Sequence, residues 1–127
     1  STANISNSSI LNLDIRGNSS AQIKENSTIN CSAKDLECVK LERISSINID
    51  SSTITGGANK DAIKIGETSQ VNLKESTVNS TKSSSILVDG PLSYLRVKDT
   101  STTINGTVTC GNINAFAFRP GGTDLCN

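Results

Sequence analysis

Aromatic residues are almost absent from this chain of 127 residues, and histidine, methionine and tryptophan are missing altogether. The aromatics are limited to Tyr94, Phe116 and Phe118. Without large rings, a core has to be built from leucine and β-branched side chains, which suit stacked strands better than a compact two-layer domain. The lack of histidine also excludes a Ser–His–Asp triad and, together with the lack of a Cys-x-x-Cys pair, argues against zinc. We therefore expect neither a metal nor a cofactor.

An excess of one charge and long apolar runs are missing as well. The 12 basic and 12 acidic residues balance, and no basic patch or Lys/Arg cluster points to nucleic acid or to an anionic membrane. The longest apolar runs, such as Ile86-Leu87-Val88, are far shorter than the roughly 20 residues that span a bilayer. No signal peptide is visible, although Ser1 could be the start of a mature chain. We expect neither nucleic-acid binding nor membrane insertion.

Serine, threonine and asparagine are abundant instead, with 20, 13 and 14 residues respectively. Isoleucine, leucine and valine still number 29, an aliphatic supply that a disordered chain would lack. The length suits one ordinary domain. The composition therefore indicates a single folded unit.

Four stretches, which start at Leu13, Val39, Ile63 and Leu87, can be set in register. Apolar residues then fall into three columns with spacings of 24 to 26 residues: Ala21, Ile47, Val71 and Leu95; Ile23, Ile49, Leu73 and Val97; and Ile29, Ile54, Val78 and Ile104. A polar column has the same period: Ser19, Ser45, Ser69 and Ser93. Chance does not give four columns so close to one period, so the sequence is a repeat.

Within each repeat the apolar residues alternate, as in Ile63-x-Ile65 and Val71-x-Leu73, and a period of two is typical of half-buried strands. Each repeat holds three short strands separated by glycine-containing turns. This pattern predicts an all-β fold, a single-stranded parallel β-helix (β-solenoid) of four to five coils with a triangular cross-section and little helix.

The solenoid is expected to span residues 1–109, with residues 1–12 as a truncated first coil in which Ile5 and Ile10 face inward. In the fourth full coil, either Ile86 and Val88 or Leu87 and Asp89 could face inward. The charges test the register independently, because the same alignment places opposite charges on neighbouring coils. The pairs are Asp14 with Lys40, Arg16 with Glu42, and Lys24 with Asp50, which in turn lies near Lys74.

The four cysteines form two local pairs in the sequence, Cys31 with Cys38 and Cys110 with Cys126. Three connectivities are open, of which local pairing is the simplest. Disulfides would imply an oxidising compartment, so we expect a secreted, extracellular or cell-surface protein.

Residues 110–127 break the repeat, and we expect them to form a disulfide-closed C-terminal cap, since an open end would expose strand edges and apolar core. Within this segment Ile113, Ala115 and Ala117 alternate with Phe116 and Phe118. One face of the segment is therefore expected to plug the end of the solenoid.

The stretch ITGGANKDAIKIG (54–66) and the recurring I-x-x-S-T-I pattern resemble the repeats of the right-handed parallel β-helix superfamily. That superfamily includes pectin lyases, polygalacturonases, phage tailspikes and many surface proteins. The resemblance covers roughly residues 4–109. It implies a right-handed solenoid, in agreement with the bias of parallel crossovers. Because likeness of fold does not supply function, the function has to be argued from residues.

A polysaccharide-cleaving member would need paired carboxylates or a carboxylate–base set. Glu75 and Asp99 stand out, one above the other on adjacent coils, and they also fit solvated turn charges. The Asp, His, Arg and Lys signatures of the polygalacturonase-like members and the Asp clusters of the lyases do not occur in the sequence. Four or five coils also make a cylinder of only about 20–25 Å. We expect no enzymatic activity, with a truncated polysaccharide lyase or hydrolase as the alternative.

Two polar columns are expected to point outward from one face: Thr28, Thr53, Thr77 and Thr103, and two residues further on Asn30, Thr55, Asn79 and Asn105. Such ladders resemble the faces of solenoid ice-binding proteins, and they are also what a soluble parallel sheet requires. The same face could bind a glycan through hydroxyl and amide groups. Sugar sites usually contain an aromatic platform, and Tyr94 is the one ring near the body of the solenoid. We expect its ring either to pack against a sugar or to cover a turn.

The sequence as a whole predicts a non-catalytic extracellular module for surface recognition or structure, as in an adhesin, tailspike or appendage. A glycan or another cell-surface ligand is the expected partner, and an oligomer is compatible with the sequence. An ice-binding protein is one alternative. A filament subunit is another, because the Cys-closed C-terminal segment resembles type IV pilin heads, although the apolar N-terminal helix of pilins is missing.

Overall fold

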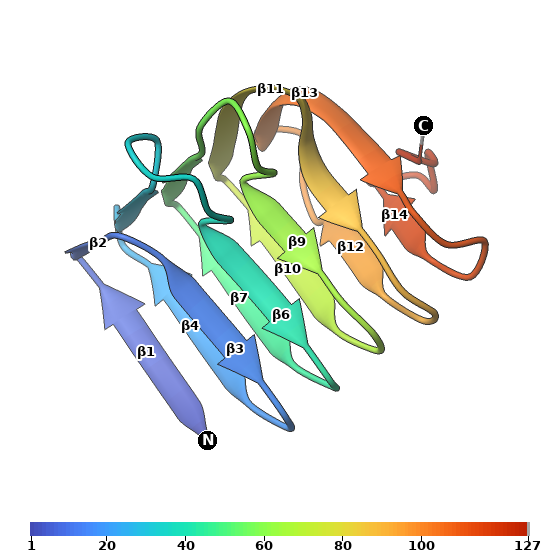
Figure 1. Ribbon diagram of the computed structural model, residues 1–127, viewed down its shortest axis with the longest axis horizontal. Coiled ribbons are helices and arrows are strands. Elements are labelled where there is room, and N and C mark those ends of the chain that lie inside the picture. The colour runs from blue at the N-terminus through green and yellow to red at the C-terminus, as the bar shows by residue number, and fades with distance from the viewer. Residues whose placement is uncertain (127) are drawn as a thin grey trace.

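The computed structural model describes residues 1–126, apart from the side chain of Ser83, and every regular element in that part of the chain is a strand. The strands are β1 (Thr2–Ser6), β2 (Ser9–Ile10), β3 (Leu13–Arg16), β4 (Ser20–Lys24), β5 (Thr28–Asn30), β6 (Val39–Glu42), β7 (Ser46–Asp50), β8 (Thr53–Thr55), β9 (Ile63–Ile65), β10 (Gln70–Lys74), β11 (Thr77–Val88), β12 (Tyr94–Val97), β13 (Thr103–Cys110) and β14 (Phe116–Phe118). They pair in parallel, and stacked positions such as Ser45 and Ser69 lie 24 residues apart. The predicted all-β parallel solenoid is confirmed (Figure 1).

Three faces surround the core. The first is the six-stranded sheet, in the order β1-β4-β7-β10-β12-β14. The other two faces share strands, because β11 and β13 run from one face to the next. We call the face of β2, β5, β8 and the first halves of β11 and β13 the Thr face. The face of β3, β6, β9 and the second halves of β11 and β13 is the charged face.

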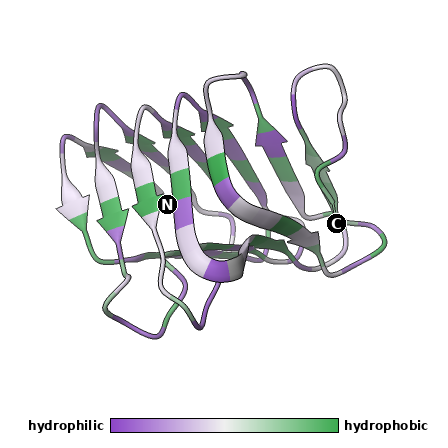
Figure 2. Cartoon of the chain, turned by 90° about the horizontal axis from the view of Figure 1, so that it is seen from above, coloured by the Kyte–Doolittle hydropathy of each residue, from purple (hydrophilic) through white to green (hydrophobic). Residues whose placement is uncertain are grey.

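The predicted apolar columns form the core, and their members are backbone partners on successive strands. Figure 2 shows apolar positions recurring along the stacked strands. Of the two alternatives for the fourth full coil, Ile86 and Val88 face inward and are fully buried. Ile5 and Ile10 of the first coil pack against the core and are partly buried, as expected.

The sequence predicts a turn at the corner between the Thr face and the charged face in every coil, but only some of the coils have one. Residues 31–38 and 56–62 form loops at this corner, but β11 and β13 continue through it in the following coils. The pairing of these two strands shifts register between Asn79 and Ser84 and again between Ser84 and Ile86. Irregularities of this kind let a strand bend without ending. In β13 the bend falls at Gly106, whose φ is 118°, whereas β11 passes the corner without a glycine.

The other two corners are turned by residues with left-handed backbone. Glu25, Ser51 and Glu75 have φ values of 58°, 50° and 47° between the six-stranded sheet and the Thr face. Ile44 and Leu92, both at 60°, lie at the corner between the charged face and the six-stranded sheet. This backbone is unfavourable for a β-branched residue such as Ile44. The stacked coils therefore impose the corner even where the residue type opposes it.

Both cysteine pairs form local disulfides, Cys31–Cys38 and Cys110–Cys126, which is the simplest of the three connectivities. Ala115 and Ala117 of the C-terminal segment are buried against the end of the solenoid. The predicted cap ends at Asn127, which lies outside the described residues.

The face that plugs the end is that of Ala115 and Ala117, but Ile113, which the alternation places with them, is 93% exposed. Asn112 turns the chain at this point. Its Oδ1 accepts a hydrogen bond from Asn114 N at 2.9 Å, and its carbonyl oxygen accepts one from Ala115 N at 3.0 Å. The alternation of residues 113–115 therefore belongs to a turn, and the strand begins only at Phe116.

The predicted charge register is present in the pairing. Arg16 is the backbone partner of Glu42, and its Nε lies 3.7 Å from Glu42 Oε2. Asp50 is likewise the partner of Lys74, but no ion pair joins their side chains within the described residues. Exposed pairs contribute at most about 1 kcal/mol, so the charges report the register more than they stabilise it.

Candidate functional site

The predicted Thr column exists as a regular row on the Thr face. Its four members are backbone partners on β5, β8, β11 and β13: Thr28, Thr53, Thr77 and Thr103. Their hydroxyls make no hydrogen bond to any described residue. A groove of about 420 Å³ borders the row and is lined largely by serine and threonine. Because coils stack at about 4.8 Å, the hydroxyls repeat at that spacing and are free to bind solvent.

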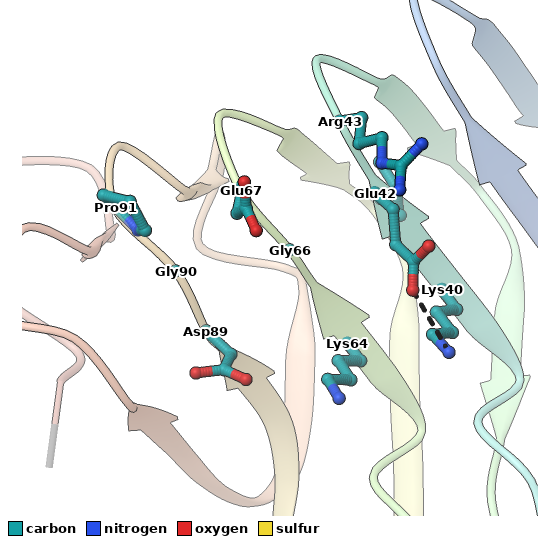
Figure 3. Close-up of a pocket in the computed structure, with 10 residues that line it drawn as sticks. Lys40, Glu42, Arg43, Lys64, Gly66, Glu67, Asp89, Gly90 and Pro91 are labelled. Atoms are coloured by element: carbon teal, nitrogen blue, oxygen red, sulfur yellow. Dashed lines mark ion pairs between the residues drawn. The ribbon is translucent and has the colours of Figure 1, made fainter.

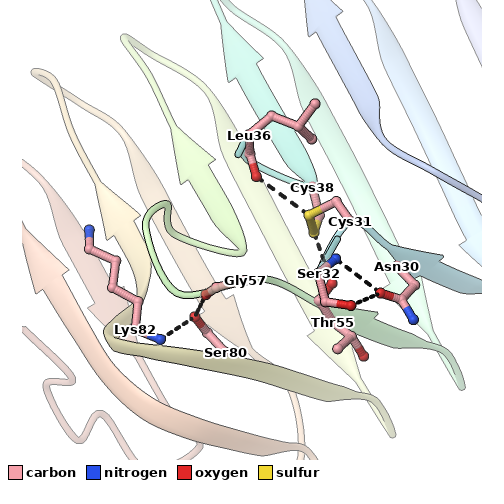
Figure 4. The surroundings of a disulfide bond; sticks show 9 residues. All are labelled: Asn30, Cys31, Ser32, Leu36, Cys38, Thr55, Gly57, Ser80 and Lys82. Atoms are coloured by element: carbon pink, nitrogen blue, oxygen red, sulfur yellow. Dashed lines mark hydrogen bonds between the residues drawn. A yellow bond between two sulfur atoms is a disulfide. The ribbon is translucent and has the colours of Figure 1, made fainter. Parts of the chain in front are cut away.

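The neighbouring column of Asn30, Thr55, Asn79 and Asn105 is also in register. Its asparagines are mostly engaged within the protein. Asn105 Nδ2 donates to Asn79 Oδ1. Asn30 Oδ1 accepts hydrogen bonds from Ser32 N at 3.0 Å and from Ser32 Oγ at 2.7 Å, beside the Cys31–Cys38 disulfide (Figure 4). These asparagines therefore stabilise the loop of residues 31–38 and the pairing of β11 with β13. Fewer of their polar groups are left for a ligand than the sequence suggests.

A column of buried hydroxyls directly precedes the Thr column, and the sequence reasoning missed it. Its members are Ser27, Ser52, Ser76 and Thr102. Ser76 Oγ donates to the carbonyl oxygen of Lys74 at 2.8 Å and accepts from Ser52 N at 3.2 Å. The signal was visible as a hydroxyl residue immediately before each threonine of the Thr column. These side chains satisfy corner backbone groups and are closed to ligands.

Glu75 and Asp99 are stacked on adjacent coils, as expected. The Asp99 carboxylate accepts four hydrogen bonds, from Thr102 Oγ1 at 2.6 Å, Ser101 Oγ at 2.7 Å, Glu75 N at 2.9 Å and Thr102 N at 3.2 Å. The bonds from the Thr102 and then the Ser101 hydroxyl lower the pKa of Asp99 below its ordinary value. A general acid at neutral pH needs the opposite shift. The Asp99 carboxylate therefore stabilises the turn between β12 and β13.

The structure brings all three aromatic side chains together on the outer surface of the six-stranded sheet. Tyr94 is the backbone partner of Phe116, and Phe118 lies two residues further along β14. The ring centroids of Tyr94 and Phe118 are 6.2 Å apart, as are those of Phe116 and Phe118. The Phe116 side chain is 41% exposed, and the other two are partly exposed. We call these three residues the aromatic cluster.

The sequence reasoning considered Tyr94 alone, because Phe116 and Phe118 were assigned to the cap. The spacing held a signal, since Phe116 follows Tyr94 by 22 residues, close to the coil period. Extending the repeat into the cap would have aligned the two rings on neighbouring strands. Tyr94 is therefore one of three rings on this surface and not an isolated cover for a turn.

A column of hydrogen-bonding side chains runs along the same surface toward the cluster. Its members are backbone partners on β4, β7, β10 and β12: Gln22, Asn48, Asn72 and Arg96. Asn72 Nδ2 donates to Asn48 Oδ1 at 2.9 Å. Arg96 is in turn the partner of Phe118. A shallow groove of about 270 Å³ borders the first three of these residues. We call this row the polar column.

A cleft of about 450 Å³ lies on the charged face (Figure 3). It is lined by three cationic and three anionic residues: Lys40, Arg43, Lys64, Glu42, Glu67 and Asp89. Lys40 Nζ already pairs with Glu42 Oε1 at 3.2 Å. Because the charges balance, the cleft has no net attraction for an ion of either sign. It is a weaker candidate for a binding site than the outer surface of the six-stranded sheet.

Among residues 1–126, no group of three or more His, Cys, Asp or Glu side chains is placed to hold a metal ion. The same part of the chain contains no helix with the length and apolarity needed to cross a bilayer. Comparisons with family models, with curated proteins and with solved structures found no match. The fold and the site define a class, a parallel β-solenoid with an aromatic cluster at one end of a sheet. Its two disulfides are typical of proteins from oxidising compartments.

Proposed function

We propose that this chain is a non-catalytic recognition module that binds a glycan on the outer surface of its six-stranded sheet. The observation that carries the proposal is the gathering of every aromatic residue of the chain at one place on that surface. Partly exposed rings in a cluster mark a contact surface in a soluble protein. Sugar rings have apolar faces that pack on aromatic rings, while their hydroxyl groups require polar partners close by.

The polar column supplies those partners. Amide groups at Asn48 and Asn72 offer both donors and acceptors, and the Arg96 guanidinium adds donors next to Phe118. Since the coils repeat at about 4.8 Å, a chain-like glycan lying along the solenoid axis would meet one such side chain per coil. The proposed site therefore combines a stacking platform with a row of hydrogen-bonding groups.

We also propose that the chain is a member of the right-handed parallel β-helix superfamily and works as a secreted or surface-displayed module of an adhesin, tailspike or appendage. The parallel solenoid supports the family assignment. The two disulfides support the extracellular location. The four hydrogen bonds and the lowered pKa of Asp99 support a structural role for this carboxylate in place of that of a general acid.

A polysaccharide panel tests the glycan proposal. The protein is screened against immobilised plant, bacterial and animal polysaccharides, and binding to each positive polysaccharide is measured by titration calorimetry. Tyr94→Ser and Phe116→Ser introduce the residue type that β7 carries at Ser46, and each should weaken binding about tenfold through loss of ring stacking. Thr53→Ser, on the Thr face, is the matched control and should bind like the wild type. Absence of binding to the whole panel, or equal binding by all variants, would contradict the proposal.

The unbonded hydroxyls of the Thr column favour a second candidate, ice binding by the Thr face. This function predicts thermal hysteresis and inhibition of ice recrystallisation by the wild type. Thr53→Tyr and Thr77→Tyr should abolish both effects because the large rings interrupt the row, whereas Tyr94→Ser on another face should retain them. Absence of both effects in the wild type, or their retention in both threonine variants, excludes this candidate.

A further inference from the structure

Two of the three rings in the aromatic cluster stand on β14, the last strand of the six-stranded sheet. This strand is three residues long, and β12 is its only partner within that sheet. Its inward side chain is Ala117, in the column where β12 and β7 carry Leu95 and Ile47. Alanine buries much less apolar area than leucine or isoleucine. The core therefore anchors β14 more weakly than it anchors β7, β10 and β12.

Residues 119–126 return along the other edge of β14. Phe118 forms an antiparallel bridge with Asp124, and Leu125 N donates to the carbonyl oxygen of Ala117 at 2.8 Å. This return is tied to β13 at its end, because Cys126 forms a bridge with Val108 and a disulfide with Cys110. The Cys110–Cys126 disulfide thus holds the segment that covers the second edge of β14.

The two disulfides differ in accessibility. Cys31 and Cys38 are fully buried, and Cys38 Sγ lies 3.1 Å from the carbonyl oxygen of Thr55 (Figure 4). Cys110 and Cys126 are only partly buried. Thiol–disulfide exchange requires a thiolate to reach a sulfur of the disulfide. We therefore expect an external thiol to react with Cys110–Cys126 in the folded protein before it reacts with the fully buried Cys31–Cys38.

We propose that the Cys110–Cys126 disulfide is a thiol-sensitive latch on the aromatic cluster, and that its reduction by a dithiol frees β14 and separates Phe116 and Phe118 from Tyr94. One thiolate of the dithiol attacks a sulfur of the disulfide, and the other cysteine leaves as a thiolate. The second thiolate of the reagent then displaces the first cysteine and closes a cyclic disulfide. The protein gains two electrons and two protons, which the dithiol supplies. The loss of ligand binding rests on the proposed glycan function, whereas the release of β14 does not.

The test follows the two disulfides and β14 separately during a dithiothreitol titration of the folded protein. Alkylation and mass spectrometry identify which cysteines are reduced. Hydrogen exchange reports β14, and the fluorescence of Tyr94, the single tyrosine in a chain without tryptophan, reports the cluster. We expect Cys110 and Cys126 to be alkylated first. Exchange at Ala117, Phe118 and Leu125 should then accelerate by roughly a hundredfold, while β7 and β10 keep their protection.

The double variant Cys110→Ser/Cys126→Ser gives the released state without a reductant. Its β14 should exchange as fast as in the reduced wild type, and dithiothreitol should cause no further change there. The variant also controls for general effects of the reagent on Tyr94 fluorescence.

The polysaccharide panel, run on oxidised and reduced protein, separates the two proposals. Binding by the oxidised form that disappears on reduction supports both. Release of β14 in a protein that binds no polysaccharide in either form supports the latch and removes the glycan function. Unchanged protection of β14 after reduction of Cys110–Cys126, or earlier reduction of Cys31–Cys38, overturns the latch.

Discussion

Inward and outward positions of the six-stranded sheet keep to the repeat to different degrees. From β4 to β14, the inward residues of one column stay small or medium-sized and apolar: Ala21, Ile47, Val71, Leu95 and Ala117. Their outward neighbours begin polar and end aromatic: Ser20, Ser46, Gln70, Tyr94 and Phe116. An inward position meets the same closed surroundings in every coil, whereas an outward position is free to vary. A break in the outward pattern therefore points to contacts outside the fold.

The largest loss of stability should come from substitution of a side chain in the buried core. Ile54→Ala removes a fully buried side chain from the column shared with Ile29 and Val78. We expect the free energy of unfolding to fall by about 2–5 kcal/mol, measured by urea denaturation. Thr53→Ala, at the adjacent half-buried outward position, should lower it by less than about 1 kcal/mol. Similar losses for the two variants would remove the distinction between inside and outside.

The buried hydroxyls at the corners should have an intermediate effect. Ser76→Ala removes the acceptor for Ser52 N and the donor to the Lys74 carbonyl oxygen. The Lys74 carbonyl oxygen keeps its bond from Ser51 N at 3.0 Å, but Ser52 N is left without a partner, and an unpaired buried backbone N–H costs about 1–3 kcal/mol in the free energy of unfolding. Ser46→Ala, an outward serine, serves as the control in the same denaturation experiment. If the two serine variants were equally stable, the corner hydroxyls would not be structural.

The aromatic cluster should matter little for stability. Phe116→Ser removes a side chain that is 41% exposed and its stacking on Phe118. We expect a change of roughly 1 kcal/mol or less in the free energy of unfolding. Denaturation of this variant complements its binding measurement. A loss as large as that of Ile54→Ala would make the cluster part of the core and weaken the case for a ligand.

The smallest effect should be the pH dependence from Asp99. Its folded-state pKa is lowered, chiefly by the Thr102 and Ser101 hydroxyls. The ionised group therefore stabilises the fold above its unfolded pKa of about 3.9, and this contribution is lost as the pH falls through the folded pKa. Asp99→Asn should melt slightly below the wild type at neutral pH, and the difference should close in acid. Asp35→Asn, in an exposed loop, controls for loss of one charge. A difference that persists in acid would contradict this account.

The interior was predictable because burial constrains it. Columns such as Ile29, Ile54 and Val78 recur at nearly constant spacing, and that spacing fixed the coil length, the strand faces and the pairing register. The disulfides were predictable as the simplest pairing, since each joins cysteines that are close in sequence.

The cap was less predictable because it leaves the repeat. Alternation through Ile113 and Ala115 reads like a strand, but the hydrogen bonds of Asn112 form a turn there. Because the cap departs from the repeat, the sequence also did not reveal that Tyr94 and Phe116 are neighbours. Their proximity depends on the pairing of β14 with β12. The right-handed winding and the division at residue 109 stay predictions.

The side-chain amides on the surface give the solenoid a direction. Asn72 Nδ2 donates to Asn48 Oδ1 on the six-stranded sheet, and Asn105 Nδ2 donates to Asn79 Oδ1 on the Thr face. In both pairs the donor lies on the later coil, so the amide dipoles align along the axis as peptide dipoles align in a helix. The two ends of the solenoid therefore differ in polarity at these two pairs, even where the residue types of successive coils repeat.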